Sequence, residues 1–249
     1  MIKKSKQKNI FITGGSRGIG LSMVKKFAEK GDKVYFTYLK SKKSYFKKIG
    51  ILSKQNIIPI KCDMTKLSSI NKLKKILGKE KKIDVLVNNV GDVVRRSSFL
   101  QSTDRLWKDT LNLNLLSAVR TTKIMVKKLL KSDNPVVINI SSIASKVGGS
   151  GDSLHYGVSK SGINTFTSGL AREFKKFSFH IRVVAIAPSI VDTDFQKRHS
   201  PKARLNKIIK STPIRRIANP LEIANLAYFL STKEAAYISG DTIFVTGGR

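Results

Sequence analysis

The stretch that decides the fold is Asn9-Ile10-Phe11-Ile12-Thr13-Gly14-Gly15-Ser16-Arg17-Gly18-Ile19-Gly20. A short apolar run passes directly into glycines and then into an amphipathic stretch with Met23, Val24 and Phe27 on one face. This pattern predicts a buried strand, a tight turn and a helix. Glycines at such a join let the backbone approach a pyrophosphate, and the helix N-terminus offers unpaired N–H groups. The stretch therefore indicates a nucleotide-binding turn.

The spacing of the glycines, Gly-x-x-x-Gly-x-Gly, differs from the Gly-x-Gly-x-x-Gly of the usual dinucleotide fingerprint. On their own, glycines between a strand and a helix also suit a tight turn with no ligand. If a dinucleotide binds here, the residues expected to hold it are those of the turn: Gly14, Ser16, Arg17, Gly18, Ile19 and Gly20.

Apolar runs and amphipathic stretches alternate along the rest of the chain. The runs predict strands over residues 9–13, 33–38, 57–60, 83–88, 136–140, 181–186 and 242–245. Pro59 is best tolerated if its strand lies at a sheet edge. The longer stretches predict helices over residues 42–54, 67–77, 104–130 and 156–176, and one that begins at Pro220.

Continuous β-branched runs separated by helices are typical of a parallel sheet covered on both faces. We therefore expect an α/β protein, with a doubly wound three-layer Rossmann fold and a mostly parallel seven-stranded sheet. We find no repeat, no low-complexity linker and no break in composition. Residues 1–249 are thus expected to form a single NAD(P)-binding domain, with a substrate flap around residues 189–212.

The composition is strongly basic. The 249 residues include 48 Lys and Arg against 16 Asp and Glu, a formal net charge of +32. Such a charge suits nucleic acid, a membrane surface or an acidic partner. However, lysine far outnumbers arginine, and the lysine pairs are spread along the chain rather than clustered with aromatic residues. We interpret the charge mainly as a lysine-rich solvated surface and do not favour a nucleic-acid partner.

Simple features of the sequence argue against a membrane-spanning protein, a secreted protein and a metal-binding protein. No apolar run approaches the roughly 20 residues that span a bilayer, and the N-terminus lacks the apolar region of a signal peptide. We therefore expect a cytoplasmic protein with no membrane span. A single cysteine, Cys62, excludes an intramolecular disulfide, and with only three scattered histidines no metal site is expected.

The second predicted strand bears on cofactor choice. NAD-preferring sites commonly carry an acidic residue about 20 residues after the glycine turn, where it binds the ribose 2′-hydroxyl. The stretch from Lys33 to Cys62 has no Asp or Glu and instead offers Lys40, Lys42 and Lys43. Together with Arg17, these cations would pair with a 2′-phosphate. We predict NADP(H), although the lysines also follow the general bias of the chain.

Polar residues follow three later elements. Asn88-Asn89-Val90-Gly91 follows the fourth strand, Ser141-Ser142 follows the fifth, and Tyr156-Gly157-Val158-Ser159-Lys160 begins a helix. Tyr156 and Lys160 share a helix face, and a nearby ammonium stabilises a phenolate and lowers its pKa. We expect the hydroxyls of Ser142 and Tyr156 to meet at one rim of the sheet.

Taken together, these motifs resemble the short-chain dehydrogenase/reductase family, and within it the 3-oxoacyl-(acyl-carrier-protein) reductases. The resemblance covers almost the whole chain. It is carried by Thr13-Gly14-x-x-x-Gly18-x-Gly20, Cys62-Asp63-Met64, Asn88 to Gly91, Asn114, Ser142, Tyr156-x-x-x-Lys160, Pro188 to Thr193 and Val245 to Gly248. It implies an NADPH-dependent oxidoreductase that reduces a carbonyl to a secondary alcohol.

The resemblance also implies a role for individual residues. Tyr156 would exchange the proton with the substrate oxygen, Lys160 would hold the nicotinamide ribose and lower the pKa of Tyr156, and Ser142 would bind the substrate oxygen. Asn114 would organise a water that connects Lys160 to solvent. The remaining contacts to the cofactor are expected from Asp63 and Met64 beside the adenine, from Asn89 in the cleft, and from Pro188, Val191 and Thr193 beside the nicotinamide.

Partners and alternatives stay open at this point. The substrate is expected to be a small or carrier-bound carbonyl compound. Acyl carrier protein is a candidate partner for Arg95 and Arg96. The protein is expected to form a homodimer or homotetramer. His155 is expected at the lip of the site and His199 in solvent. The alternatives are a related enzyme of secondary metabolism or surface-sugar biosynthesis, and a basic binding protein on the same scaffold.

Overall fold

A seven-stranded sheet forms the centre of the computed structural model, which describes residues 7–41, 45–46, 50 and 55–249. The strand order is β3-β2-β1-β4-β5-β6-β7, and every neighbouring pair is parallel. The strands are β1 (Asn9–Ile12), β2 (Lys33–Tyr38), β3 (Ile57–Lys61), β4 (Val85–Asn88), β5 (Val136–Ile140), β6 (Arg182–Pro188) and β7 (Thr242–Val245). The doubly wound fold is confirmed, and the sheet is wholly rather than mostly parallel.

The strands are mostly apolar because helices cover both faces of the sheet. Successive side chains alternate between the faces, so Ile10 and Ile12 pack into one core cluster while Phe11 packs into the other. Pro59 lies in β3, which is an edge strand as expected.

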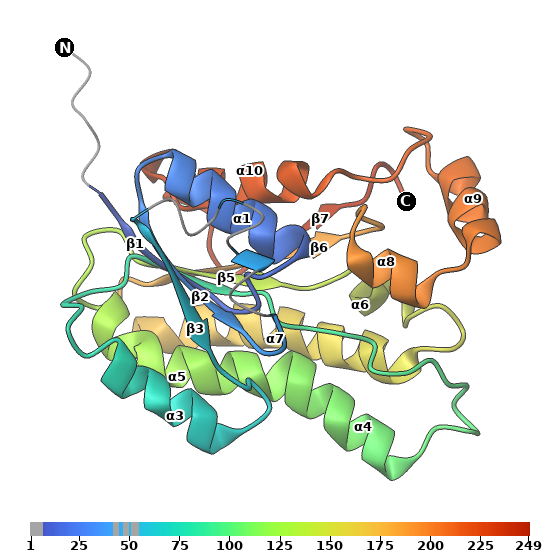
Figure 1. Cartoon of the computed structure of the whole chain (residues 1–249), viewed down its shortest axis with the longest axis horizontal. Helices are drawn as coiled ribbons and strands as arrows, with labels where there is room; N and C mark the ends of the chain where they lie inside the picture. The colour runs from blue at the N-terminus through green and yellow to red at the C-terminus, as the bar shows by residue number, and fades with distance from the viewer. Residues whose placement is uncertain (1–6, 42–44, 47–49, 51–54) are drawn as a thin grey trace.

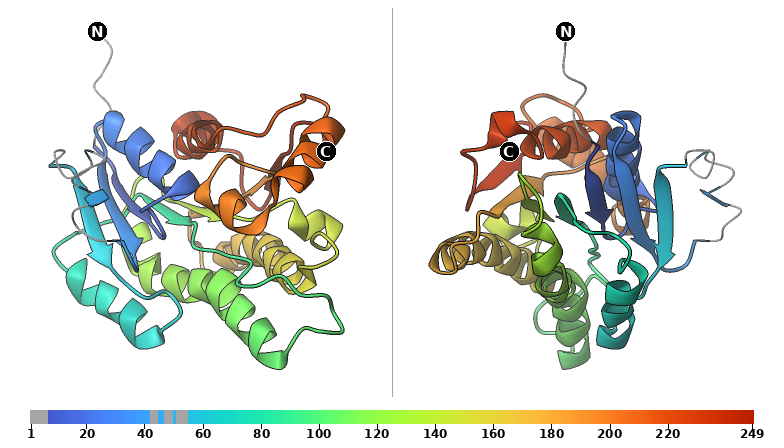
Figure 2. Two further views of the ribbon diagram at one scale, coloured as in Figure 1. Left: turned by 45° about the vertical axis from the view of Figure 1, so that its right-hand side comes forward. Right: turned by 90° about the vertical axis from the view of Figure 1, so that its left-hand side faces the viewer.

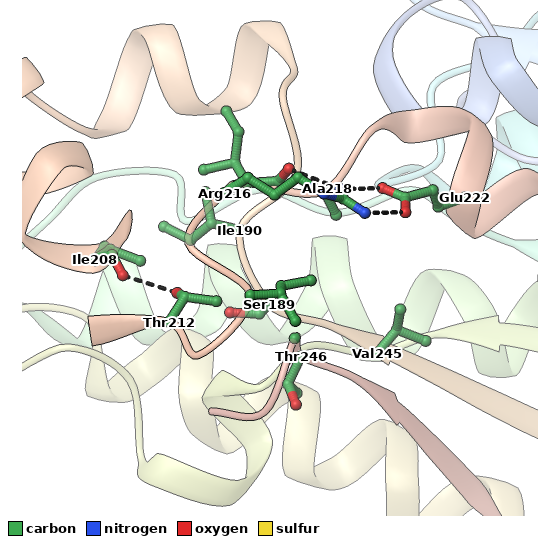
Figure 3. Close-up of a pocket in the computed structure, with 12 residues that line it drawn as sticks. Ser189, Ile190, Ile208, Thr212, Arg216, Ala218, Glu222, Val245 and Thr246 are labelled. Atoms are coloured by element: carbon green, nitrogen blue, oxygen red, sulfur yellow. Dashed lines mark hydrogen bonds and ion pairs between the residues drawn. The ribbon is translucent and has the colours of Figure 1, made fainter. Parts of the chain in front are cut away.

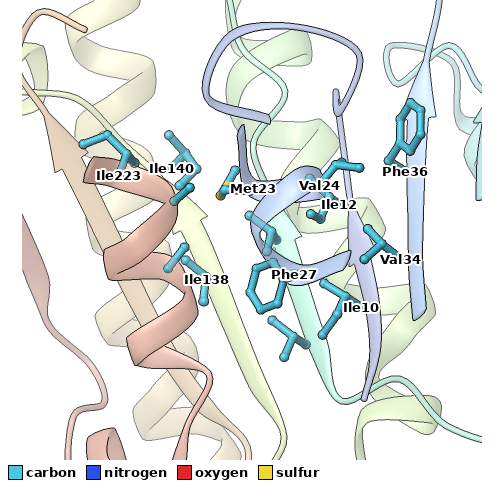
Figure 4. Packing of buried hydrophobic residues seen from close by; sticks show 14 of the residues in the cluster. Ile10, Ile12, Met23, Val24, Phe27, Val34, Phe36, Ile138, Ile140 and Ile223 are labelled. Atoms are coloured by element: carbon cyan, nitrogen blue, oxygen red, sulfur yellow. The ribbon is translucent and has the colours of Figure 1, made fainter. Parts of the chain in front are cut away.

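Two sets of helices make the outer layers (Figures 1 and 2). Helices α1 (Gly18–Glu29) and α10 (Pro220–Leu230) pack side by side on one face, whereas α3 (Leu67–Ile76), α5 (Ser117–Leu129) and α7 (Leu154–Lys176) cover the other. Figure 4 shows Met23 and Phe27 of α1 directed toward the strands, with Ile223 of α10 close to Ile140. No helix in the described part of the chain is both long and apolar enough to cross a membrane.

The helix expected over residues 104–130 contains an irregular turn. It consists of α4 (Asp104–Leu111), a π-helical turn η1 (Asn112–Leu116) and α5. Thr103 caps its start, because its Oγ1 accepts a hydrogen bond from Leu106 N at 3.2 Å. A π-helical turn inserts an extra residue into the helical repeat and is frequent at functional sites. Here it carries Asn114, which is buried.

The segment expected to be a flap, residues 189–212, is mostly helical. It contains α8 (Asp194–His199) and α9 (Lys202–Ser211), joined at Ser200 and Pro201. These two helices are not predicted by the sequence pattern, and neither are the short helices α6 (Ala144–Val147) and η2 (Lys233–Ala235). Of the helix expected over 42–54, only Tyr45, Phe46 and Gly50 are described, so Lys42 and Lys43 lie outside the described residues.

Candidate active site

The glycine turn is held in a geometry that larger residues could not adopt. Gly14 N donates to Thr37 Oγ1 at 3.0 Å, which ties the turn to the end of β2. Gly14 and Gly18 have φ values of +68° and +54°, and a Cβ on Gly20 would lie only 2.2 Å from Gly14 O. The first turn of α1 therefore packs closely against the start of the glycine turn, which leaves no room for a side chain at Gly20.

The start of α1 is open to an anion. Its first turn contains no acidic residue, and among the described residues no side chain caps it. Arg17, at the N-cap position, is exposed, and Ser16 and Ile19 are half-buried on either side. This uncapped helix start fits a pyrophosphate, which the N–H groups and the helix dipole would both attract.

Asn89 braces the glycine turn from the neighbouring strand. Its Nδ2 donates to Thr13 O at 2.9 Å and to Gly14 O at 3.0 Å. Thr13 Oγ1 in turn accepts from the backbone N of Asn89 at 2.9 Å and of Val90 at 3.1 Å. The structure therefore gives Asn89 a supporting contact to the turn as well as a position beside the predicted cleft.

The segment after β6 returns to the same turn. Pro188 ends β6, Val191 is buried in a parallel bridge with Ala218, and Thr193 precedes α8. A Cβ on Gly18 would lie 3.2 Å from Thr193 Cγ2, so the glycine turn and this segment are in close contact. The residues expected beside the nicotinamide are thus brought next to the turn expected to hold the phosphates.

On the predicted adenine side, Asp63 is ordered by its own loop. Its Oδ1 accepts from Thr65 N at 3.0 Å and from Thr65 Oγ1 at 2.6 Å. Burial acts to raise the pKa of Asp63, but these hydrogen bonds and the charge of Lys66 hold the pKa below its ordinary value. Met64 packs into the core, so contact with an adenine would come from its backbone, while Lys40 is exposed beyond β2.

Three predicted catalytic residues meet beyond the carboxyl end of β5. The hydroxyl of Tyr156 hydrogen-bonds Ser142, and Lys160 Nζ lies 5.7 Å from the centroid of the Tyr156 ring. Lys160 is buried, and its Nζ donates to Ile140 O at 2.8 Å. The long helix α7 holds Tyr156 and Lys160 on one face, as their spacing predicts.

The pKa values in this cluster differ from the sequence expectation. Burial raises the pKa of Tyr156 to about 12, which the hydrogen bond from Ser142 only partly offsets. Burial also lowers the pKa of Lys160 to about 8. The expected lowering of the Tyr156 pKa by Lys160 is therefore not seen, because the ammonium donates to Ile140 O and is itself penalised by burial.

Asn114 completes the predicted catalytic set. Its Nδ2 donates to Asp92 O at 2.8 Å and to Thr110 O at 2.9 Å. A Cβ on Gly91 would lie 2.6 Å from Asn114 Oδ1 and 2.9 Å from Lys160 Nζ, so glycine leaves room for these two side chains to converge. The π-helical turn and Gly91 together place Asn114 beside Lys160.

The flap segment reaches this cluster through Phe195. The ring centroids of Phe195 and Tyr156 are 6.2 Å apart, and those of Phe195 and His199 are 4.9 Å apart. The expectation that His199 is solvated is wrong, because its Nε2 lies 2.7 Å from Asp92 Oδ1 and its side chain is largely buried.

Two other sequence expectations in this region are also corrected. His155 is buried rather than at a lip, and its Nε2 lies 3.1 Å from Val93 O. Arg96 is not a free cation, because its Nη1 pairs with Asp152 Oδ1 at 2.6 Å. Arg95, by contrast, is exposed.

A pocket of about 60 Å³ lies against the segment that follows Pro188 (Figure 3). Its wall includes Ser189 and Ile190, Ile208 of α9 and Val245 at the end of β7. Figure 3 shows Arg216 and Glu222, which also line the pocket, joined by two contacts. Ser142, Tyr156 and Lys160 lie outside the described lining. Ser189 does not have a positive φ, so its backbone is not strained.

Comparison with known proteins identifies the class to which this fold and site belong. A family model described as enoyl-(acyl carrier protein) reductase matches residues 14–249. The chain therefore belongs to the short-chain dehydrogenase/reductase family, whose members are NAD(P)-dependent oxidoreductases acting on carbonyl or alcohol groups.

Individual relatives within this family show a more specific similarity, to 3-oxoacyl-[acyl-carrier-protein] reductases. The 3-oxoacyl-[acyl-carrier-protein] reductase FabG of Chlamydia muridarum is 32% identical over 97% of this chain and 96% of its own length. FabG of Escherichia coli strain K12 is 32% identical over 95% of both chains. Among solved structures, the Pseudomonas aeruginosa RhlG/NADP active-site complex superimposes with a TM-score of 0.88 at 25% identity, covering 97% of this chain and 95% of that one.

Proposed function

We propose that this protein uses NADPH to reduce a 3-oxoacyl thioester, carried by acyl carrier protein, to the 3-hydroxyacyl thioester. The observation that carries the proposal is the convergence of Asn114, Ser142, Tyr156 and Lys160 at the carboxyl ends of β4 and β5, next to the glycine turn. Relatives that share about a third of the residues over nearly the whole chain are named for this reaction, which supports the substrate class.

The cofactor proposal is supported by the glycine turn. When bound, NADPH supplies the hydride, while the protein orients it and provides the proton. The uncapped start of α1 suits the pyrophosphate, and the exposed cations Arg17 and Lys40 suit a 2′-phosphate. A structural relative whose title names NADP supports the same choice. The rest of the cofactor site would be lined by Asn89, Asp63, the backbone of Met64, Pro188, Val191 and Thr193.

The raised pKa of Tyr156 suits reduction. A phenol with a pKa of about 12 keeps its proton at neutral pH until an alkoxide forms on the substrate oxygen. Ser142, already hydrogen-bonded to that phenol, would hold the same oxygen and stabilise its developing charge. Lys160 lies beside Tyr156 and is a cation below its pKa of about 8. Asn114 would organise the water that returns the proton from solvent.

Acetoacetyl thioesters provide the test. The enzyme is expected to oxidise NADPH with acetoacetyl thioester, and Tyr156→Phe is expected to lose at least about a thousandfold in kcat because the proton donor is gone. NADPH binding by fluorescence titration should change little. Tyr237→Phe, at a fully exposed tyrosine, is the matched control and should keep wild-type rates.

Four results would overturn parts of the proposal. Turnover retained in Tyr156→Phe would remove the assigned proton donor. Reduction of crotonyl but not acetoacetyl thioester would shift the reaction to the enoyl group named by the family model, and turnover of keto-sugars alone would favour the surface-sugar alternative. NADH binding tighter than NADPH would contradict the role given to Arg17 and Lys40.

Assembly and location are proposed on the same basis. We infer a homodimer or homotetramer, with an acidic carrier protein approaching the exposed Arg95. The basic binding-protein alternative is tested by a salt series, because binding to DNA through phosphates falls steeply with salt concentration. The cytoplasmic location expected from the sequence stays a prediction.

A further inference from the structure

The carboxylate of Asp92 connects the loop after β4 to the flap, residues 189–212. Its Oδ2 accepts from Arg198 Nη1 at 2.8 Å, and its Oδ1 lies 2.7 Å from Nε2 of His199. Both partners belong to α8. Only 16% of the Asp92 side chain and 12% of the His199 side chain are exposed, whereas Arg198 is 40% exposed, so the contact with His199 is the better shielded from solvent.

The backbone of the same residue positions Asn114. Asn114 Nδ2 donates to Asp92 O at 2.8 Å, and Asp92 N donates to Asn114 Oδ1 at 3.0 Å. This pair of hydrogen bonds fixes the amide in one orientation. Asp92 is therefore the residue through which the flap and the predicted catalytic amide are directly linked.

The turn that follows Asp92 is strained. Val94 has a φ of +66°, and Arg95 N donates to Val93 O across it at 2.8 Å. A β-branched residue in this left-handed region is an outlier. The turn is held in place because Val94 N donates to Asp92 Oδ1 at 3.2 Å and Val93 O contacts His155 Nε2 at 3.1 Å.

A second tie holds the flap without touching Asn114. Arg96 Nε donates to His199 O at 2.7 Å, and its Nη1 donates to Asp152 Oδ1 at 2.6 Å. Arg204 of α9 reaches Asp152 Oδ2 at 3.3 Å. Asp152 pairs with two arginines, whereas Asp92 pairs with an arginine and a histidine. Among the described residues, the Asp152 side chain does not contact Asn114, Ser142, Tyr156 or Lys160, so Asp152 provides a natural comparison.

We propose that Asp92 is a positioning residue that couples the seating of the flap to the orientation of Asn114. When α8 is seated, Arg198 and His199 hold the Asp92 carboxylate, and the strained turn keeps the backbone of Asp92 against the Asn114 amide. When α8 leaves, the carboxylate loses both partners, the turn relaxes and the amide loses its fixed orientation. The inference rests on the proposed function only for its effect on turnover.

Electrostatics support this assignment. Burial acts to raise the pKa of Asp92, but the hydrogen bond and charge of Arg198, with the charge of His199, hold the pKa below its ordinary value. Asp92 is therefore ionised while the flap is seated. Its charge also acts to raise the pKa of Tyr156, the proposed proton donor, although burial is the main cause of that shift.

The first test needs no substrate. Asp92→Asn keeps the shape of the side chain and removes its charge. Arg198→Gln removes the charge of the more exposed of the two partners of Asp92. In both variants the Ser200 amide, which donates to Gln196 O at the end of α8, is expected to exchange its hydrogen at least about tenfold faster than in the wild type. Equal exchange in wild type and Asp92→Asn would overturn the link to the flap.

The second test reads Asn114 directly. The side-chain amide signals of Asn114 in a ¹H–¹⁵N spectrum, assigned with Asn114→Asp, are expected to shift in Asp92→Asn and, in the same direction, in Arg198→Gln. Asp152→Asn loosens the Arg204 tie and is expected to leave those signals in place. Signals that stay put in Asp92→Asn, or move as far in Asp152→Asn, would make Asp92 a general flap anchor and overturn the coupling.

The third test is turnover. In Asp92→Asn, kcat for acetoacetyl thioester is expected to fall about tenfold while the KM for NADPH changes less than about twofold, because the cofactor cleft is untouched. An unchanged kcat would contradict the inference. If the wild type turns over no carbonyl substrate, the proposed function fails, and the exchange and amide tests still decide whether the coupling exists.

Discussion

Lys160 illustrates how a single residue at this site trades stability for chemistry. Its ammonium is buried, donates to one backbone carbonyl and has a pKa of about 8, whereas its ordinary value is 10.5. Because the folded-state pKa is the lower one, the unfolded chain binds more protons between these values. The destabilisation is thus fully present below about pH 8 and is relieved as the pH rises toward 10.5.

Replacing this lysine should therefore stabilise the fold at neutral pH. Lys160→Met is expected to raise the free energy of unfolding at pH 7 by about 1–3 kcal/mol and to abolish reduction. The gain should shrink as the pH approaches about 10, where wild-type Lys160 is neutral in the folded state. Urea unfolding at both pH values measures it, and a variant less stable than wild type at pH 7 would contradict the assigned burial cost.

Val94 provides a second prediction at the residue scale. Asparagine tolerates the left-handed region better than valine, so Val94→Asn is expected to raise the free energy of unfolding by about 1 kcal/mol. Val147→Asn is the control, since Val147 is also exposed but has no positive φ. Equal changes in thermal unfolding for the two variants would show that the Val94 turn stores no strain.

At the scale of elements, the two neighbouring helices α1 and α10 begin in opposite ways. Asn219 and Glu222 form a capping box at α10, and Arg216 makes two contacts with Glu222, whose pKa its hydrogen bond lowers to about 2. In the described residues α1 has no such side-chain cap. The free N–H groups at the start of α10 are capped by its own side chains, whereas those at the start of α1 stay available to the proposed ligand.

The capping box should matter for stability. Asn219→Ala is expected to lower the free energy of unfolding by about 1 kcal/mol, because the first N–H groups of α10 lose their acceptor. Asn206→Ala, at an exposed position within α9, should cause no comparable loss. Chemical denaturation compares the two, and an equal loss in both would show that the cap contributes nothing.

The elements that the sequence predicts well are those with local signals. Buried β-branched runs predicted the strands, Pro59 predicted an edge, and Pro220 predicted the start of α10. The π-helical turn at Asn114 has no local signature, because Asp92 and Gly91, about 22 positions away, stabilise and permit it. The helices of the flap are short and polar, and α9 buries none of its residues, so their apolar periodicity is weak.

In the candidate site, too, the features with local sequence signals are predictable and those that depend on distant residues are not. The glycine turn and the Tyr156–Lys160 pair follow from spacing along one helix or one loop. The Asp92–His199 contact joins residues 107 positions apart, so only the fold shows that His199 is paired rather than solvated. The sign of the Tyr156 pKa shift was missed for a related reason, since it depends on burial that the flap and α7 create together.

At the scale of the whole molecule, exposed apolar residues on covering helices indicate assembly. Leu116 of η1 and Val158 of α7 are 39% and 43% exposed, and these two elements are in contact. Sedimentation velocity at micromolar concentration is expected to show a dimer or tetramer, and Val158→Asp is expected to reduce the assembly. Leu67→Asp, at an exposed residue of α3, is the control. A wild-type monomer would refute the prediction.

The strand order also determines when each part of the sheet can form while the chain leaves the ribosome. Every strand pairs with one already made: β2 joins β1, β3 joins β2, β4 returns to β1, and β5, β6 and β7 follow outward. No late strand has to insert between two earlier ones. The last to emerge, β7, covers β6, and Gly247 and Gly248 then close against Ile214 and Pro213. Until β7 has emerged, the nascent chain exposes the β6 edge, and pairing with β7 removes that opportunity for aggregation.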